Sequence, residues 1–253
     1  MSAVMARGSA PVFDPRLTQD PAAKRPFVQQ LFTHIAPRYD WFNRLASVGL
    51  DQRWRRAVVR RARLEPSHRV LDVCSGTGDL ALLCGAACPA PRRVIGADMN
   101  RAMLERAQQK QRRRRLHVDW AQADAEALPF ATGAFDRVLI GFSTRNLGDL
   151  TQALREMVRV LRPGGVLLIL ETGYPSHPVL RAGYQAFLFT VARSIGWMLT
   201  GRCWPFTYLA RSVRQFLTPE QFCARLQSVG TQVEYVPLSC GLASLYLATK
   251  PGA

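Results

Sequence analysis

The chain has 253 residues, of which 48% are hydrophobic, and it carries a formal net charge of +16 at pH 7. This hydrophobic content is enough to build a core, which excludes a wholly disordered chain and allows one large or two small domains. The positive charge attracts nucleic acid, anionic lipid or acidic partners, and composition does not choose among them. The six cysteines include no Cys-x-x-Cys pair and the four histidines are scattered. We therefore expect reduced cysteines, no metal site and a cytoplasmic location.

The character of the sequence changes near its beginning. Residues 1–26 contain prolines and no hydrophobic periodicity, which predicts a flexible arm, and they lack the features of a signal peptide. Residues 27–63 have apolar side chains at helical spacing, which predicts helices. An aromatic and polar segment with Tyr39 and Asp40 lies between these helices. It is either a helix junction held by buried rings or part of a lid over a ligand site.

The segment Val70–Ala81 reads as a buried strand, a glycine turn and the start of a helix. Glycine at 76 and 78, around Thr77, lets the backbone approach a ligand and adopt turn conformations that a Cβ forbids. This pattern opens a nucleotide-binding α/β domain, although an ordinary tight turn has it too. Asp98 ends the next predicted strand, where it can accept hydrogen bonds from a ribose. Together these features predict an adenosine ligand, a part shared by NAD and S-adenosylmethionine.

The middle of the chain alternates short apolar segments with helical ones, which predicts a doubly wound α/β fold with a parallel sheet. A Pro-Gly-Gly turn separates the helix that begins at Leu150 from the fifth strand. The last two strands are expected to form an antiparallel hairpin at one edge, which gives a mostly parallel sheet of seven strands. Besides the strand that begins at Val70, the strands are expected at 93–98, 116–122, 135–141, 166–171, 232–238 and 242–249.

Residues 175–216 interrupt this alternation. Large apolar side chains gather at 184–199, but Arg193 and Gly196 break the run, and it is too short to span a bilayer. This segment is either a buried helix, a cover for a hydrophobic substrate, or a helix on a membrane surface. We expect it to be an insertion in a single domain that covers residues 27–253.

Features beyond the glycine turn favour S-adenosylmethionine over NAD. A dehydrogenase would need a Tyr-x-x-x-Lys pair on a helix, but the pair Tyr246 and Lys250 falls in the terminal strand, where residues four apart cannot act together. A methyltransferase instead needs a polar side chain after the third strand to hold adenine, a Pro-Gly-Gly turn and two closing strands. Asp124, residues 163–165 and the C-terminal hairpin supply these three features.

With these residues in place, the chain from about residue 32 to 250 resembles the ubiquinone/menaquinone biosynthesis C-methyltransferase family. The Arg145-Asn146 pair after the fourth strand and the Tyr39-Asp40 segment make the resemblance specific. It implies a Rossmann-like class I methyltransferase fold, S-adenosylmethionine as cofactor, and C-methylation of a reduced polyprenyl quinone. Demethylmenaquinol is the favoured substrate, and the alternatives are the 2-methoxy-6-polyprenyl-1,4-benzoquinol of ubiquinone synthesis and another phenolic or RNA substrate. Further matching motifs are Ser47–Asp51, Trp54-Arg55, Asp124–Phe130, Arg159–Gly165 and Ser212–Arg214.

The resemblance also implies site residues. Arg145 is expected to stabilise a developing phenolate, because a phenol titrates near pH 10 and the ring carbon needs that electron density. Asn146 would orient the quinol oxygen or a water, and Tyr39 and Asp40 would complete the lid, with Asp40 the weaker candidate for proton acceptor. The alternative for the Arg-Asn pair is a helix-capping loop with a structural ion pair. The implied cofactor contacts are Gly76, Thr77, Gly78, Asp98, Met99, Asp124 and Ala125.

The lipid nature of such a substrate suggests partners. The apolar segment 184–199 is the candidate to hold a polyprenyl tail, and the basic surface suits peripheral contact with an anionic membrane at its inner face. A nucleic-acid partner is not expected, because the Arg112–Arg115 run has only Trp120 nearby for base stacking. Such a run is more often a solvated helix end. The oligomeric state does not follow from the sequence.

Overall fold

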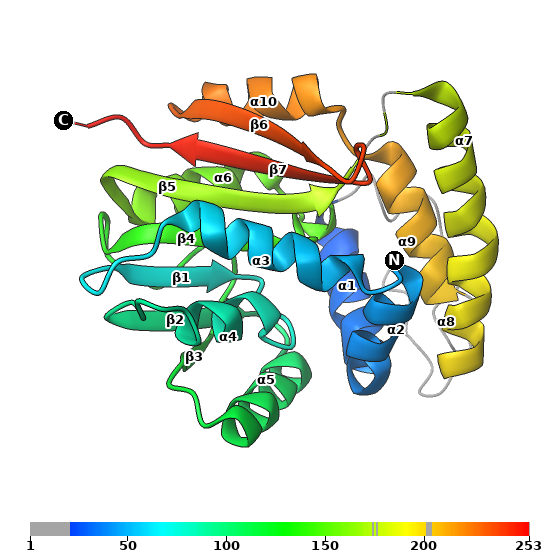
Figure 1. Ribbon diagram of the computed structural model, residues 1–253, viewed down its shortest axis with the longest axis horizontal. Coiled ribbons are helices and arrows are strands. Elements are labelled where there is room, and N and C mark those ends of the chain that lie inside the picture. Colours follow the sequence, from blue (N-terminus) through cyan, green and yellow to red (C-terminus); the bar gives the residue numbers. More distant parts are fainter. Residues whose placement is uncertain (1–20, 174, 176, 201–203, 253) are drawn as a thin grey trace.

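The computed structural model describes residues 21–173, 175, 177–200 and 204–252. Its seven strands are β1 (Arg69–Val73), β2 (Arg93–Asp98), β3 (Asp119–Gln122), β4 (Phe135–Gly141), β5 (Leu161–Thr172), β6 (Gln232–Leu238) and β7 (Ala243–Thr249). They form one sheet in the order β3-β2-β1-β4-β5-β7-β6 (Figure 1). The first five strands pair in parallel, whereas β7 runs antiparallel to both β5 and β6. The predicted α/β fold with its antiparallel C-terminal hairpin is confirmed.

Helices cover both faces of the sheet. Val138, Leu139 and Ile140 of the central strand are fully buried, so both faces are covered, as parallel strands require. Helices α3 and α4 pack on one face, and α6 and α10 pack on the other. The helices around the sheet are α3 (Leu50–Ala62), α4 (Asp79–Gly85), α5 (Arg101–Arg114), α6 (Leu150–Val160) and α10 (Pro219–Ser228).

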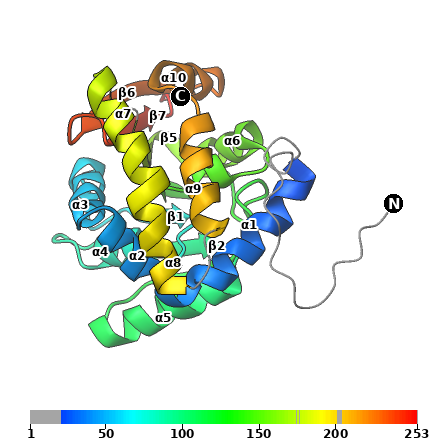
Figure 2. The same cartoon turned by 90° about the vertical axis from the view of Figure 1, so that its right-hand side faces the viewer.

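A further group of helices lies across the carboxyl ends of the parallel strands, on the right of Figure 1 and toward the viewer in Figure 2. Its apolar side chains form one cluster, in which Phe27 and Leu31 pack with Phe42 and Tyr208. This cluster holds the chain's first helices against its later insertion. The helices of this layer are α1 (Pro21–Ile35), α2 (Tyr39–Ala46), α7 (Pro178–Phe187), α8 (Arg193–Thr200) and α9 (Trp204–Gln215).

The largest differences from the sequence prediction are at two boundaries. Helix α1 begins at Pro21, so residues 21–26 are helical and do not belong to the expected flexible arm. Proline suits the first position of a helix, where its missing N–H has no partner to lose, but Pro26 inside the helix disguises the pattern. Strand β5 begins at Leu161, which pairs with Phe135 of β4, so the strand includes the predicted Pro-Gly-Gly turn. Two 2.9 Å backbone hydrogen bonds join this turn to Lys250, the residue after β7. Residues 1–20 of the expected arm lie outside the described residues.

The apolar segment 184–199 is divided among several helical pieces. Helix α7 passes through a π-helical turn at Leu188–Ala192 into α8. Tyr184, Phe187 and Ile195 pack against the cluster of the helical layer, so the segment is half buried. In the part of the chain that the structure describes, none of the helices has the length and hydropathy needed to cross a membrane. Residues 176 and 201–203 of the expected insertion are outside that part.

Candidate active site

A cavity of about 900 Å³, including the solvent at its mouth, lies between the helical layer and the sheet. It opens over the carboxyl ends of β1 to β4, where ligands bind in open α/β sheets. Helices α1, α2 and α3 contribute to the opposite wall. Asp40, Gly78 and Arg145 do not line it, although they were predicted in the site. The predicted residues that do line it are Tyr39, Gly76, Thr77, Asp98, Met99, Asp124, Ala125 and Asn146.

The two glycines of the turn have different surroundings. Gly76 has a φ of +55°, and a Cβ built there meets nothing within 4 Å, so its backbone faces open space in the cavity. Gly78 has a φ of +82°, and a Cβ there would lie 2.5 Å from Cη2 of Trp120. Gly78 allows the start of α4 to pack against Trp120, and it does not line the cavity, so the expected cofactor contact there stays a prediction that this geometry does not support.

We expect alanine substitution to separate these two roles. Gly78→Ala must displace the Trp120 ring, and such overpacking costs about 1–3 kcal/mol in addition to the left-handed backbone cost of roughly 1–2 kcal/mol. Gly76→Ala carries only the backbone cost, but its methyl group would occupy the cavity. Thermal unfolding should show the larger loss of stability for Gly78→Ala, and titration with S-adenosylhomocysteine should show the larger loss of affinity per folded protein for Gly76→Ala. The reverse order would contradict this assignment.

Asp98 connects the glycine turn to the end of β2. Its Oδ2 accepts a hydrogen bond from the Gly76 backbone N–H at 2.7 Å, and its Oδ1 accepts one from the Asn100 N–H at 2.7 Å. Burial raises the pKa of this carboxyl, and the two backbone donors oppose that rise. Each oxygen keeps a lone pair for a further donor, so the carboxylate can accept ribose hydroxyls from the cavity.

Asp124 and Ala125 lie at the β3 end of the cavity. The Asp124 Oδ1 accepts a hydrogen bond from the Glu126 N–H at 2.9 Å, and Arg25 of α1 forms an ion pair with the same carboxylate. An adenine amino group that binds Asp124 would share it with Arg25. The sequence prediction missed Arg25, because this residue falls in the proline-containing segment that was interpreted as an arm.

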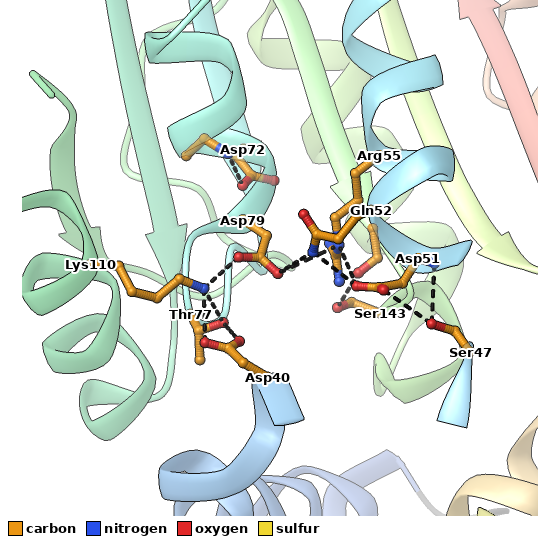
Figure 3. Close-up of polar contacts among 12 residues, drawn as sticks. Asp40, Ser47, Asp51, Gln52, Arg55, Asp72, Thr77, Asp79, Lys110 and Ser143 are labelled. Carbon is orange, nitrogen blue, oxygen red and sulfur yellow. Dashed lines mark hydrogen bonds and ion pairs between the residues drawn. The ribbon is translucent and has the colours of Figure 1, made fainter. Parts of the chain in front are cut away.

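Four side chains, Asp40, Thr77, Asp79 and Lys110, form a charged clasp between the lid and the glycine turn (Figure 3). The Thr77 hydroxyl donates to Asp40 at 2.5 Å, and Lys110 Nζ donates to the other oxygen of Asp40 at 2.9 Å. Lys110 also pairs with Asp79. Burial alone would raise the pKa of Asp79, but the positive charges of Arg55 and Lys110 hold this pKa below its usual value. The clasp favours the lid interpretation of the Tyr39 segment. Because both oxygens of Asp40 are engaged, its expected use as a proton acceptor finds no support in this geometry.

Arg145 lies in a buried ion pair. Its guanidinium contacts Glu171 at the end of β5, and the two side chains are 7% and 1% exposed. The other Glu171 oxygen accepts a hydrogen bond from the Thr144 hydroxyl at 2.6 Å. The structure therefore favours the alternative given above for the Arg-Asn pair, in which Arg145 forms a structural ion pair. Arg145 is not a cation that faces the cavity.

Asn146 and Tyr39 face the cavity from opposite walls. The Asn146 Oδ1 accepts a hydrogen bond from the Tyr208 hydroxyl at 3.1 Å, which fixes the orientation of the amide. Burial raises the pKa of Tyr39 above its ordinary value of 10.0, although Arg55 opposes the rise. Tyr39 is therefore protonated at neutral pH and is suited to donate a hydrogen bond, not to accept a proton.

Asp72 of β1 is a buried acid behind the glycine turn. Its Oδ2 accepts a hydrogen bond from the Ala81 N–H at 2.9 Å, and its Oδ1 has no partner among the described residues. Burial raises its pKa from 3.8 to about 7. Between pH 4 and pH 7, the Asp72 carboxyl is consequently protonated more often in the folded state than in the unfolded state.

A neutral residue at position 72 should remove the resulting pH dependence. Because the pKa of Asp72 is raised in the folded state, the contribution of this carboxyl to the free energy of unfolding is fully present below pH 4 and is lost as pH rises through 7. The total change is at most about 4 kcal/mol, at roughly 1.4 kcal/mol per pKa unit. We expect the stability of Asp72→Asn relative to wild type to increase between pH 5 and 8. Urea unfolding across this range measures it, with Asp119→Asn, an exposed acid, as the control. A constant difference would show that Asp72 does not titrate in this window.

Comparison with known proteins decides the family. Residues 19–250 match the family model described as the ubiE/COQ5 methyltransferase family. The chain belongs to the ubiE/COQ5 methyltransferase family. Among its relatives is a demethylmenaquinone methyltransferase of Thermus thermophilus, 41% identical over 87% of this chain and 100% of the relative. Another is a ubiquinone/menaquinone biosynthesis C-methyltransferase UbiE of Geotalea uraniireducens, 37% identical over 88% of this chain and 96% of the relative.

Solved structures agree on the fold of this ubiE/COQ5 methyltransferase. A SAM-dependent methyltransferase from Aquifex aeolicus has a TM-score of 0.57 at 17% identity and covers 77% of this chain and 88% of its own. The [4+2]-cyclase SpnF has a TM-score of 0.61 at 21% identity and covers 80% of this chain and 82% of its own. Because a cyclase shares the fold, the likeness identifies the architecture and leaves the reaction to the site.

Proposed function

We propose that this enzyme transfers a methyl group from S-adenosylmethionine to a ring carbon of a reduced polyprenyl quinone, with demethylmenaquinol as the preferred substrate. The observation that carries the proposal is an adenosine-type cavity in a chain 41% identical to a demethylmenaquinone methyltransferase. The second candidate is the benzoquinol precursor of ubiquinone, because the Geotalea relative is named for both pathways.

The residues of the cavity fit the cofactor. We assign the ribose to Asp98, the adenine amino group to Asp124 and an adenine ring nitrogen to the Ala125 N–H, with Met99 beside them. The open space at Gly76, which a Cβ would fill, lets the backbone approach the ligand. When bound, S-adenosylmethionine supplies an electrophilic methyl group on a positively charged sulfur.

The chain's own residues prepare the quinol ring. In this proposal Asn146 orients the quinol oxygen, and Tyr39, kept protonated by burial, donates a hydrogen bond to it. Arg145 acts as a positioning residue, because its ion pair with Glu171 holds the short 3₁₀ turn Thr144–Asn146. The lid excludes water, which strengthens these interactions and keeps the ring in line with the methyl donor.

Methyl transfer from labelled S-adenosylmethionine tests the proposal. Reduced demethylmenaquinone, reduced 2-methoxy-6-polyprenyl-benzoquinone, a simple phenol and total RNA are assayed in parallel. Label in menaquinol is the expected result. Label only in the benzoquinol would move the enzyme to the ubiquinone pathway, and label in phenol or RNA alone would reject a quinol substrate.

We also propose that the enzyme meets its lipid substrate at an anionic membrane surface. Helices α2 and α8 pack together, and these helices and the turn after α2 expose large apolar side chains in a protein of net charge +16. The exposed fractions are 64% for Trp41, 82% for Val48, 57% for Trp197 and 76% for Met198. A basic protein with exposed aromatic side chains is suited to the interface of anionic lipid.

Removing the exposed rings should weaken this association. We expect the double variant Trp41→Ser/Trp197→Ser to bind phosphatidylglycerol vesicles at least about fivefold more weakly than wild type in cosedimentation, because two interfacial anchors are lost. Val179→Ser is the matched control, because Val179 is 72% exposed at the beginning of α7, the end remote from α2 (Figure 1). Equal binding by all three proteins would place the membrane contact elsewhere.

A further inference from the structure

Arg55 of α3 is a buried cation in the wall of the cavity. Only 6% of the residue is exposed, and it is among the residues that line the cavity. Its Nε has no hydrogen-bond partner among the described residues. A buried charge with an unused donor is costly, and such groups normally have a partner.

The nearby carboxylates hold this guanidinium without satisfying it. Arg55 Nε lies 3.7 Å from Oδ2 of Asp51 and 3.7 Å from Oδ2 of Asp79, beyond hydrogen-bond distance (Figure 3). Its Cζ lies 5.2 Å from the centre of the Phe142 ring, which fixes another side of the group. The contacts balance the charge and fix the position of Arg55, and they leave it able to bind an anionic group in the cavity.

The order of the strands indicates which ligand group reaches Arg55. Along the cavity, β3 carries Asp124, β2 carries Asp98 and β1 leads into the glycine turn, in that spatial order. Arg55 lies beside the end of the next strand, β4, where its Nη1 would be 3.4 Å from a Cβ at Gly141. A cofactor with adenine at β3 and ribose at β2 must therefore extend its methionyl group toward β1 and β4.

We propose that Arg55 binds the carboxylate of the cofactor's methionyl group, an assignment that rests on the proposed function. The methionyl group has one carboxylate, and a guanidinium is the side chain best matched to it. Among the described residues, the other cation that lines the cavity is Arg25, which is already paired with Asp124 at the adenine end. The competing role for Arg55 is contact with the quinol oxygen, which would matter only when quinol is bound.

Calorimetric titration without quinol tests this assignment. S-adenosylhomocysteine and its decarboxylated analogue, which keeps the adenosine and the amine, are each titrated into wild type, Arg55→Gln and Arg56→Gln. We expect Arg55→Gln to weaken S-adenosylhomocysteine binding by roughly 10–100-fold and to change binding of the analogue by less than about threefold. Arg56 is an exposed arginine of the same helix, so Arg56→Gln should bind both ligands as wild type does.

The outcomes separate this inference from the function on which it rests. Unchanged S-adenosylhomocysteine binding by Arg55→Gln would overturn the assignment, and a rise in the quinol KM alone would then place Arg55 at the quinol oxygen. An equal loss for both ligands would also overturn it, because a general disturbance of the site does not depend on the carboxylate. If wild type binds neither ligand, the proposed function fails and the assignment fails with it. Recovery of part of the affinity by Arg55→Lys, for the carboxylate ligand only, would support it.

Discussion

Replacing Asp98 with alanine should lower the affinity for S-adenosylhomocysteine by at least about 100-fold. Two hydrogen bonds from ribose hydroxyls to a carboxylate contribute roughly 1.5–3 kcal/mol each, and each 1.4 kcal/mol is about tenfold in affinity. The substitution also removes the acceptor for the Gly76 and Asn100 N–H groups, each bonded at 2.7 Å, so the glycine turn loses its anchor. Both effects act on binding in the same direction.

Calorimetry on three variants separates the causes. Asp98→Asn keeps one acceptor oxygen and should lose less affinity than Asp98→Ala. Asp119→Ala removes an exposed acid from the opposite end of the neighbouring strand and should bind as wild type does. Far-ultraviolet circular dichroism checks that all variants are folded. If a folded Asp98→Ala protein binds S-adenosylhomocysteine with wild-type affinity, the ribose does not bind this carboxylate and the adenosine lies elsewhere.

Replacing Arg145 with alanine should destabilise the fold by about 3–5 kcal/mol. The substitution leaves Glu171, whose side chain is 1% exposed, as a buried charge without its cation, and breaking a buried pair in this way costs roughly that amount. The remaining donors to Glu171, from Thr144, Thr172 and the backbone N–H of residue 145, carry no charge and do not neutralise it. Urea unfolding at pH 7 measures the change in the free energy of unfolding.

A second substitution tests the cause. Arg145→Ala/Glu171→Gln removes the buried charge as well, so the double variant should be more stable than Arg145→Ala alone. Arg155→Ala, on the exposed side of α6, is the control and should change stability by less than about 0.5 kcal/mol. If Arg145→Ala unfolds like wild type, the ion pair is not structural. Where the double variant is folded, a reduced kcat with unchanged S-adenosylhomocysteine affinity supports the positioning role proposed for Arg145.

Local patterns predicted the main parts of the site. Gly76 and Asp98 belong to adjacent strand–turn units, and parallel strands bring such residues to one edge of the sheet. The structure places both in the cavity and bonds one to the other. Gly78 was assigned the same role, because sequence spacing does not tell whether a glycine faces a ligand or the ring of Trp120.

The partners of the charged residues were not predictable in this way. Arg25 and Lys110 lie in a chain with 34 lysines and arginines, and nothing in their neighbours along the sequence marks them. Arg55 belongs to a motif of the family resemblance, but that motif gave it no role. Lys110 meets Asp40 from a helix far along the chain, and Arg145 meets Glu171 at the end of another strand. These contacts depend on how helices cross the sheet.

The sequence by itself determined the strands, the glycine turn, the position of Asp98 and the family, because hydrophobic periodicity, turn chemistry and motif spacing are local properties. Only the tertiary structure decided which charged side chains are paired within the protein and which can bind a ligand. Burial and distance settle that question: Arg145 is in close contact with Glu171 and does not line the cavity, whereas Arg55 lines the cavity and its neighbouring carboxylates are 3.7 Å from its Nε, beyond hydrogen-bond distance.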